Sequence, residues 1–266
     1  RGVARAAGRL SMHRAAAVLA MLACALGAAE PGPVIEVENE AAVPAAELES
    51  ILKDFRAWAA RVYRYHHVTS PPPVTLRLTR KVPFGFYQGS TVILPPSADR
   101  WEMLDNWVHE LTHHATGHES SFFFKEGIAV HTLEALFAQD RRVPAGWPQF
   151  GQGTDAWVAT YAARGRLPAL SDVLTWPRYQ GDTPEHDFRS WQIYNIAGSF
   201  CGWYVRRFGY PAFREAFARE WPAQDSARLQ REWLADIAGR EVQPFDPAAV
   251  LPLKRPRYRA YAERLR

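Results

Sequence analysis

Two histidines four positions apart restrict the fold of this chain more than any other feature of its sequence. They begin and end the segment HELTH at residues 109–113, an H-E-x-x-H motif. On an α-helix, residues i and i+4 lie on one face, so the imidazoles of His109 and His113 can reach a single metal ion. The motif therefore predicts a helix that presents two metal ligands. An apolar stripe beside them would anchor this helix in a core: Leu104, Trp107, Val108 and Leu111.

The flanking residues predict where this helix begins and ends. Asp99 followed by Glu102 has the spacing of a capping box, which marks a helix start. Gly117 can adopt the left-handed conformation just past a helix end. Ser120 or Ser121 can cap a second helix, which carries FFFKEGIAVHTLEALF. Because the connection is short, we expect the two helices to fold back antiparallel.

A catalytic zinc site needs a third protein ligand and leaves its fourth position to water. The midpoint of His109 and His113 lies about five residues before the helix end, or ~8 Å at the rise of an α-helix. Glu126 lies about four residues into the second helix, or ~6 Å along it, so the three groups come level. We therefore predict that His109, His113 and Glu126 hold one Zn²⁺ ion.

Three further histidines are weaker candidates for this site. His118 would suggest the metzincin pattern H-E-x-x-H-x-x-G-x-x-H, but Gly117 comes one residue late and His118 one residue early. His114 is turned by about 100° from its neighbour on the helix and is expected to be exposed. His131 lies off the face that carries the third ligand. We predict that none of the three binds the metal.

The residues before the helix pair combine strands with one helix. VIEVE, from Val34, alternates like a strand, and PAAELESILKDFRAWAARVYRYH, from Pro44, repeats apolar residues at helical spacing. In PPPVTLRLTRK, Val74 and the apolar residues after it alternate with polar ones, which predicts a half-buried strand. FGFYQGSTVILPP, from Phe84, is a further extended segment broken by Gly89.

Beyond the helix pair the pattern is again mainly helical. One helix is expected at about residues 187–208, and PAFREAFARE and DSARLQREWLADIAG predict two more. Residues 141–183 are rich in Trp, Pro and Gly, which is typical of long ordered loops. Strands first and helices after indicate an α+β fold.

This order of elements predicts a single domain over residues 30–250. Its first part, residues 30–98, is expected to be α/β and to hold a small sheet, and its second part, residues 99–250, to be mainly helical. A basic tail, residues 251–266, would complete the chain.

The amino terminus has the three parts of a secretory signal peptide. A basic flank, MHR at residues 12–14, is followed by the short apolar run AAAVLAMLACALGAAE, which ends in small residues. We expect residues 1–29 to be removed after Ala29 and the protein to be exported to the bacterial periplasm, the envelope or the medium. No stretch reaches the ~20 apolar residues that a membrane helix needs. Cys24 is a candidate lipoprotein site, although Met21 is a poor residue three positions before it.

Charge and cysteine content then exclude two classes of protein. Without residues 1–29 the chain holds 28 basic and 28 acidic residues, so its basic pI is no argument for nucleic-acid binding. The remaining basic cluster, LKRPRYRAYAERLR, is expected to be a solvated tail rather than a binding patch. Cys201 would be the only cysteine left, which rules out a disulfide scaffold.

HELTHH followed by FFFKEGIAVH resembles the gluzincin peptidases, the thermolysin-like clan, and within it the peptidase-MA-like proteins. Those proteins carry H-E-x-x-H and then an E-G-x-A segment, which is EGIA at residues 126–129 here. YNIAGSFCGWYVRRFGYPAFREAF resembles their tyrosine-bearing helix, and FGFYQGSTVIL is similar to the edge strand on which such enzymes lay peptide substrates. The resemblance covers about residues 74–220 and implies a zincin fold and a peptide or protein substrate.

The same resemblance assigns roles to further residues. It makes Tyr194 a donor to the oxyanion of the reaction, although helical spacing with core residues leaves a purely packing role open. The sequence departs from thermolysin four residues after the ligand glutamate, where Val130 replaces an aspartate that orients a histidine. Asp105, one turn before His109, is a candidate for that task.

The expected chemistry is hydrolysis by a zinc metallopeptidase. Zinc lowers the pKa of a bound water to about 7, and Glu110 lies beside the ligands as the predicted general base. An unpaired edge strand at residues 84–94 could bind an extended peptide through its backbone, and Phe122 with its two neighbours could form a pocket or pack between helices.

Two other classes of function remain open from the sequence. One is an envelope binding module that has kept zinc and lost catalysis, against which Glu110 argues, because an idle site has no use for a general base. The other is a metal-dependent hydrolase that acts on something other than peptides.

Overall fold

The computed structural model describes residues 32–97, 99–117, 121–140, 149–175, 183–217 and 223–266. Residues Pro33–Arg266 form one compact unit. The predicted signal peptide, the candidate lipoprotein site at Cys24 and the rejected ligand His118 all lie outside the described residues. Those three predictions therefore stay predictions.

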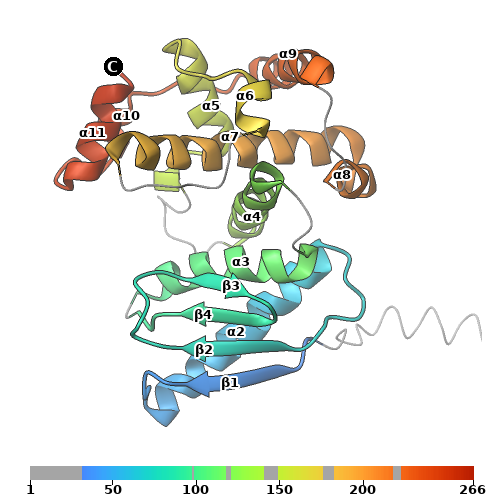
Figure 1. The fold of residues 1–266 in the computed structure, drawn as a ribbon, viewed down its shortest axis with the longest axis vertical. Helices are drawn as coiled ribbons and strands as arrows, with labels where there is room; N and C mark the ends of the chain where they lie inside the picture. The colour runs from blue at the N-terminus through green and yellow to red at the C-terminus, as the bar shows by residue number, and fades with distance from the viewer. Residues whose placement is uncertain (1–31, 98, 118–120, 141–148, 176–182, 218–222) are drawn as a thin grey trace, which may run out of the picture. The chain divides into compact units, whose positions relative to one another are not determined.

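Four strands form one sheet in the order β1-β2-β4-β3 (Figure 1). Strand β1 (Ile35–Asn39), β2 (Val74–Leu78) and β4 (Thr91–Leu94) are parallel, and β3 (Phe86–Gln88) pairs antiparallel with β4. Gly89 makes the turn between β3 and β4 with a φ of 64°. The predicted half-buried strand is confirmed, since apolar and polar residues of β2 alternate between buried and half-buried. Strand β3 forms one edge of the sheet, next to helix α3.

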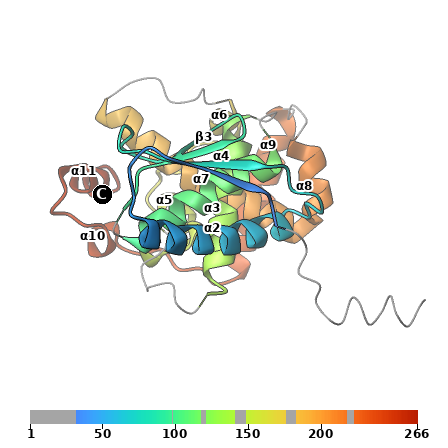
Figure 2. The ribbon, with the colours of Figure 1, turned by 90° about the horizontal axis from the view of Figure 1, so that it is seen from below.

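Two helices pack against this sheet and against each other (Figure 2). Helix α2 (Ala45–Tyr65) buries the apolar face that its sequence predicts, and helix α3 (Arg100–Thr116) carries the H-E-x-x-H motif. Their contact includes an edge-to-face pair between Phe55 and Trp107, whose ring centroids are 5.5 Å apart. Both rings are almost completely buried. Helix α3 is therefore held by its packing against both the sheet and α2.

The ends of α3 and of the next helix, α4 (Phe122–Phe137), are where the sequence predicts them. The Asp99 carboxylate accepts hydrogen bonds from the first backbone amides of α3, and Gly117 ends α3 with a φ of 82°. The Ser121 hydroxyl caps α4 by accepting from the amide of Phe124. Glu102 does not close the capping box; its carboxylate accepts from the Ser97 hydroxyl at 2.8 Å.

Seven further helices lie in the described part of the second half: α5 (Thr154–Ala163), α6 (Leu170–Leu174), α7 (Pro184–Phe208), α8 (Tyr210–Phe217), α9 (Ala223–Gly239), α10 (Pro247–Val250) and α11 (Pro256–Arg264). The molecule is thus a mixed α+β protein in which a small sheet precedes a helical part. Among the described residues, none of the helices combines the length and the apolar composition of a membrane span.

The prediction of loops throughout residues 141–183 is wrong, because α5 and α6 lie there. Helix α5 has almost no polar face: Trp157, Val158 and Tyr161 are completely buried, as are polar Thr154 and Thr160. A helix that is enclosed on several sides shows no amphipathic period, so pattern reading misses it.

The prediction of a solvated carboxyl-terminal tail is also wrong. Residues 256–264 form α11, and Tyr261 and Leu265 are buried in the core of the helical half. The Tyr261 hydroxyl donates to Asp187 at 2.6 Å, and its ring stacks on Trp191 at 4.8 Å. The arginines of this segment lie on the outer side of a packed helix. The charge of the segment therefore gives no sign of the buried apolar residues between them.

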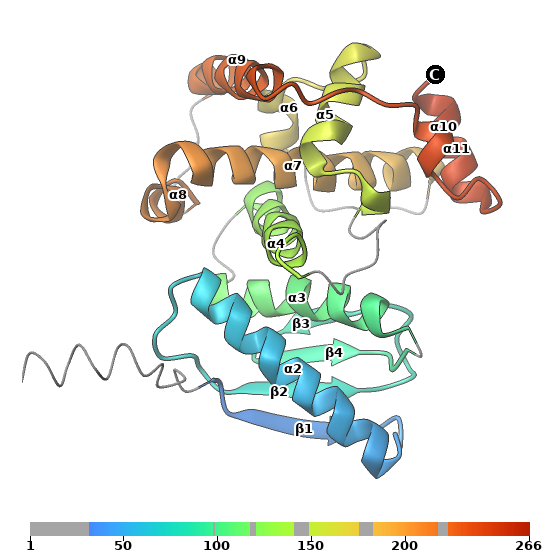
Figure 3. The same ribbon diagram turned by 180° about the vertical axis from the view of Figure 1, so that it is seen from behind.

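Helix α4 lies between α3 and α7, as Figures 1 and 3 show from opposite sides. Glycines allow α4 and α7 to approach closely. A Cβ atom at Gly127 would lie 2.6 Å from the carbonyl oxygen of Ala197, and one at Gly198 would lie 2.6 Å from Val130. The glycine of the EGIA segment therefore sets the distance between the helix of Glu126 and the helix of Tyr194.

We predict that Gly127→Ala destabilises the protein. The new methyl group would meet the backbone of α7, which cannot give way as a side chain can, so the free energy of unfolding should fall by about 1–3 kcal/mol. Urea denaturation followed by tryptophan fluorescence measures this loss. Gly239→Ala is the matched control, because Gly239 is also helical and has no atom within 4 Å of the added Cβ. Equal stability of the two variants would contradict the close crossing.

Candidate metal centre

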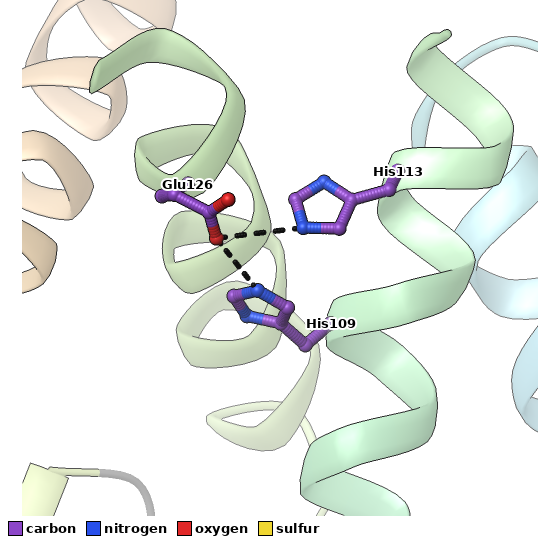
Figure 4. A group of neighbouring side chains, drawn as sticks. All are labelled: His109, His113 and Glu126. Carbon is purple, nitrogen blue, oxygen red and sulfur yellow. Dashed lines mark hydrogen bonds and ion pairs between the residues drawn. The ribbon is translucent and has the colours of Figure 1, made fainter. Parts of the chain in front are cut away.

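Three side chains converge between α3 and α4 (Figure 4). Oε2 of Glu126 lies 3.0 Å from Nε2 of His109 and 3.4 Å from Nε2 of His113. One donor atom from each residue lies within 4.8 Å of the other two. These are the three ligands that the sequence predicts, and in the described part of the chain they form the only group of this kind.

The local sequence explains this convergence. His109 and His113 are one turn apart on α3, and their rings stand perpendicular with centroids 4.7 Å apart. Helix α4 packs on α3 so that Glu126, in the second turn of α4, comes level with both imidazoles. Gly127 then permits α7 to support α4 from the other side.

Burial and mutual contact determine the pKa values of the three side chains. Burial disfavours the charged form of Glu126, but hydrogen bonds from His109 and His113 hold the pKa of its carboxyl well below the usual range. Burial also opposes the charged form of His109, yet the contact with Glu126 and the charge of Glu110 raise its pKa to about 9. For His113 burial dominates and lowers the pKa to about 4. The carboxylate is thus ionised, as a metal ligand must be.

The donor set fits a zinc ion. Two ligands bound ~2.1 Å from an ion at tetrahedral angles are ~3.4 Å apart. The two Nε2–Oε2 distances, 3.0 and 3.4 Å, are close to that spacing. Two imidazole nitrogens and one carboxylate oxygen are also a set that catalytic zinc sites use.

Glu110 is buried beside this group without belonging to it. Burial raises the pKa of Glu110, and the nearby charge of Glu126 adds to that effect. The backbone of Tyr87, on the edge strand β3, lies near this carboxylate and slightly opposes the rise of its pKa. A carboxylate with a raised pKa, held next to a metal centre, is suited to accept and release a proton.

Tyr194 reaches the same centre from α7. Its ring stacks on that of His109, with centroids 6.0 Å apart and an angle of 29° between the planes. Phe122, at the start of α4, forms an edge-to-face contact with the same tyrosine, with ring centroids 6.0 Å apart. The side chain is half-buried rather than enclosed in the core. The structure therefore brings Tyr194 to the predicted site.

Asp105 lies near His109, as the sequence suggests. Burial raises the pKa of its carboxyl to about 6, and the charge of His109 opposes that rise. Val130 is buried against Gly198 of α7, so no carboxylate reaches the centre from that position. The role of Asp105 in orienting a histidine stays a prediction.

The prediction that His114 is exposed is wrong. Its Nδ1 is hydrogen-bonded to the hydroxyl of Tyr63, and its Nε2 lies 3.3 Å from the carbonyl oxygen of Pro73. Because a carbonyl can only accept, Nε2 carries the proton and Nδ1 accepts from Tyr63. The edge of the same imidazole meets the ring of Tyr87 at 5.5 Å. His114 thus links α3 to α2 and to β3, a task that the sequence pattern did not reveal.

His131 lies outside the group of candidate ligands, as predicted, and Cys201 does not belong to it either. Nε2 of His131 is paired with the Tyr65 hydroxyl at 2.7 Å, and burial lowers the pKa of this histidine to about 4. Cys201 is buried next to Gly127, and burial raises the pKa of its thiol. The three phenylalanines that begin α4 mainly pack, since Phe123 and Phe124 are buried in the helical core.

Comparisons of the chain with known protein families, with curated protein sequences and with solved structures found no significant match. A function for this protein therefore has to be derived from the side chains described above.

We predict that Glu126→Ala purifies largely free of zinc, whereas His118→Ala retains it. Loss of a true ligand leaves two protein groups, which hold zinc much more weakly than three. Zinc content after dialysis, measured by atomic emission, tests both variants. A cobalt-substituted protein should show the spectrum of a site with two imidazoles and an oxygen ligand. Loss of metal from His118→Ala with retention in Glu126→Ala would exclude this ligand set.

Proposed function

We propose that the protein is a zinc-dependent metallopeptidase of the gluzincin type, with a zincin fold. The observation that carries this proposal is the position of Glu110. Its carboxylate lies on the same helix as His109 and His113, next to the three donor atoms but outside them. A site that only stored or displayed a metal would not need a buried carboxylate there.

When bound, a zinc ion supplies a Lewis acid and an ionised water at neutral pH. Glu110 receives the proton of the attacking water and delivers it to the leaving amine, which its raised pKa favours. The hydroxyl of Tyr194 donates to the oxygen that becomes negative during attack.

An extended peptide is the substrate that the surroundings of the site favour. Strand β3 forms an edge of the sheet and contacts α3, the helix of Glu110. An edge strand can bind a peptide through backbone hydrogen bonds, with side-chain pockets adding preference. The signal-peptide pattern at residues 1–29 supports a place of action outside the cytoplasm.

A hydrolase that acts on a non-peptide substrate is the second candidate. The metal centre and Glu110 could hydrolyse a non-peptide substrate equally well. Only the edge strand favours a peptide substrate over a non-peptide one. A zinc-bearing binding module without catalysis is less well supported, because it leaves the position of Glu110 unexplained.

We predict that Glu110→Gln keeps its zinc and loses nearly all turnover. The substitution removes the base, while His109, His113 and Glu126 remain to hold the metal. General-base catalysis contributes about 10²–10⁴-fold, and turnover should fall by that factor. Digestion of a broad peptide library followed by mass spectrometry measures turnover, and metal analysis of the same sample gives its zinc content. Normal turnover in this variant would require a different mechanism.

We predict that Tyr194→Phe lowers kcat about 10²-fold or more, as loss of other single oxyanion donors does. The ring that stacks on His109 is retained, so melting temperature and zinc content should stay close to those of the unchanged protein. If Tyr194 serves only in packing, kcat will be nearly unchanged. Measuring kcat and the melting temperature on one preparation separates the two roles.

A further inference from the structure

The metal-binding face of α3 continues beyond the metal centre toward the start of the helix. Glu102 and Asn106 precede His109 by seven and three residues, so all three lie on one face at successive turns. Asn106 lies ~7 Å along the helix axis from the midpoint of His109 and His113. Neighbouring residues on one side of an extended peptide are spaced by a similar distance, ~6.8 Å. A side chain of a peptide bound at the metal would therefore reach this part of α3.

A pocket of about 240 Å³ lies at this place. Its walls include apolar residues from the segments on either side of the β3–β4 hairpin, namely Pro83, Phe84, Pro95 and Pro96. Glu102 and Asn106 supply polar groups from α3. Apolar walls with a few polar groups are typical of a pocket that selects a side chain.

Phe84 and Gly85 show features suited to binding. The Phe84 side chain is 65% exposed, and it is one of only three large apolar side chains that are exposed in the described residues. Gly85 is pressed against the wall of the pocket: a Cβ atom there would lie 2.4 Å from Leu94 and 3.1 Å from Oδ1 of Asn106. The backbone that leads into β3 thus runs directly beside Asn106.

The carboxylate of Glu102 and Oδ1 of Asn106 are hydrogen-bond acceptors at the pocket. Nδ2 of Asn106 already donates to the carbonyl oxygen of Glu102 at 2.8 Å, which leaves Oδ1 as an acceptor. The Glu102 carboxylate accepts from the Ser97 hydroxyl, and no Lys or Arg side chain in the described ranges forms an ion pair with it. An acceptor-rich, negatively charged pocket with apolar walls fits a ligand that has an apolar stem and a cationic, donor-rich end.

We propose that this pocket binds an arginine or lysine side chain of the substrate, and that Glu102 determines this preference. The stem of the basic residue lies against Phe84 and the prolines, and its cationic group meets Glu102 and Oδ1 of Asn106. The inference rests on the proposed peptidase function for the polypeptide nature of the ligand. It adds to that function a substrate class, peptides with a basic residue near the cleaved bond.

The test uses blocked alanine hexapeptides in which one position carries Arg, citrulline or norleucine, with that position moved along the peptide. Citrulline keeps the shape of arginine without its charge, and norleucine keeps an apolar stem. Cleavage is measured as kcat/KM on the zinc-loaded protein. Binding is measured by calorimetry on Glu110→Gln, which should not cleave the peptides. Binding therefore provides a result even where no peptide is hydrolysed.

In both measurements the arginine peptides should be favoured over the citrulline peptides at one position by about tenfold or more, the size of a hydrogen bond to a charged group. Glu102→Gln should abolish this preference. The matched control is Glu49→Gln, which removes an exposed carboxylate from α2 and should preserve it. Phe84→Ala, at an exposed position, should weaken binding of arginine and norleucine peptides alike.

Equal kcat/KM and equal affinity for the three peptides would overturn the inference. A preference for arginine that persists in Glu102→Gln would overturn it as well. Absence of any hydrolysis with a binding preference that depends on Glu102 would overturn the proposed peptidase function and leave the pocket assignment standing. Hydrolysis without a preference for a basic residue would overturn the pocket assignment and leave the proposed peptidase function standing.

Discussion

The contact between the Glu126 carboxylate and two imidazoles is the interaction on which the site depends. Glu126 is only 7% exposed, and an ionised carboxylate buried without partners would cost several kcal/mol. His109 and His113 provide those partners, which is why the pKa of Glu126 is low and that of His109 is high. Because the carboxylate and its partners belong to different helices, the contact that defines the candidate metal site also ties α4 to α3.

The helix pair and the convergence of its three candidate ligands could be predicted because the signals are local. Asp99, Gly117 and Ser121 act on backbone groups within four residues of themselves, so their effects can be read without knowledge of the fold. The rise per residue of a helix then suffices to bring Glu126 level with the histidines. The alternation of β2 and the apolar face of α2 are likewise properties of short segments.

The features that the sequence did not reveal depend on distant partners. His114 is buried because Tyr63, 51 positions earlier, pairs with it, and α11 is packed because Tyr261 reaches Asp187, 74 positions earlier. Helix α5 is covered on several sides by other helices, which removes the polar face that marks a helix in a sequence. The pocket at Glu102 belongs to the same class, since its walls come from segments on either side of a hairpin and from α3.

The candidate catalytic groups are held by two different parts of the molecule. Glu110 is carried by α3, which packs on β3 and β4, and His114 of the same helix meets the ring of Tyr87 on β3, so this part is built on the sheet. Tyr194 is positioned by α7, whose distance from α4 is set by Gly127. The two parts meet where α3 packs on α4, and Glu126 bridges them there. In the proposed enzyme, the same carboxylate that would complete the metal site therefore also joins the part that carries the base to the part that carries the tyrosine, so a change at Glu126 is expected to disturb their relative position as well as the affinity for metal.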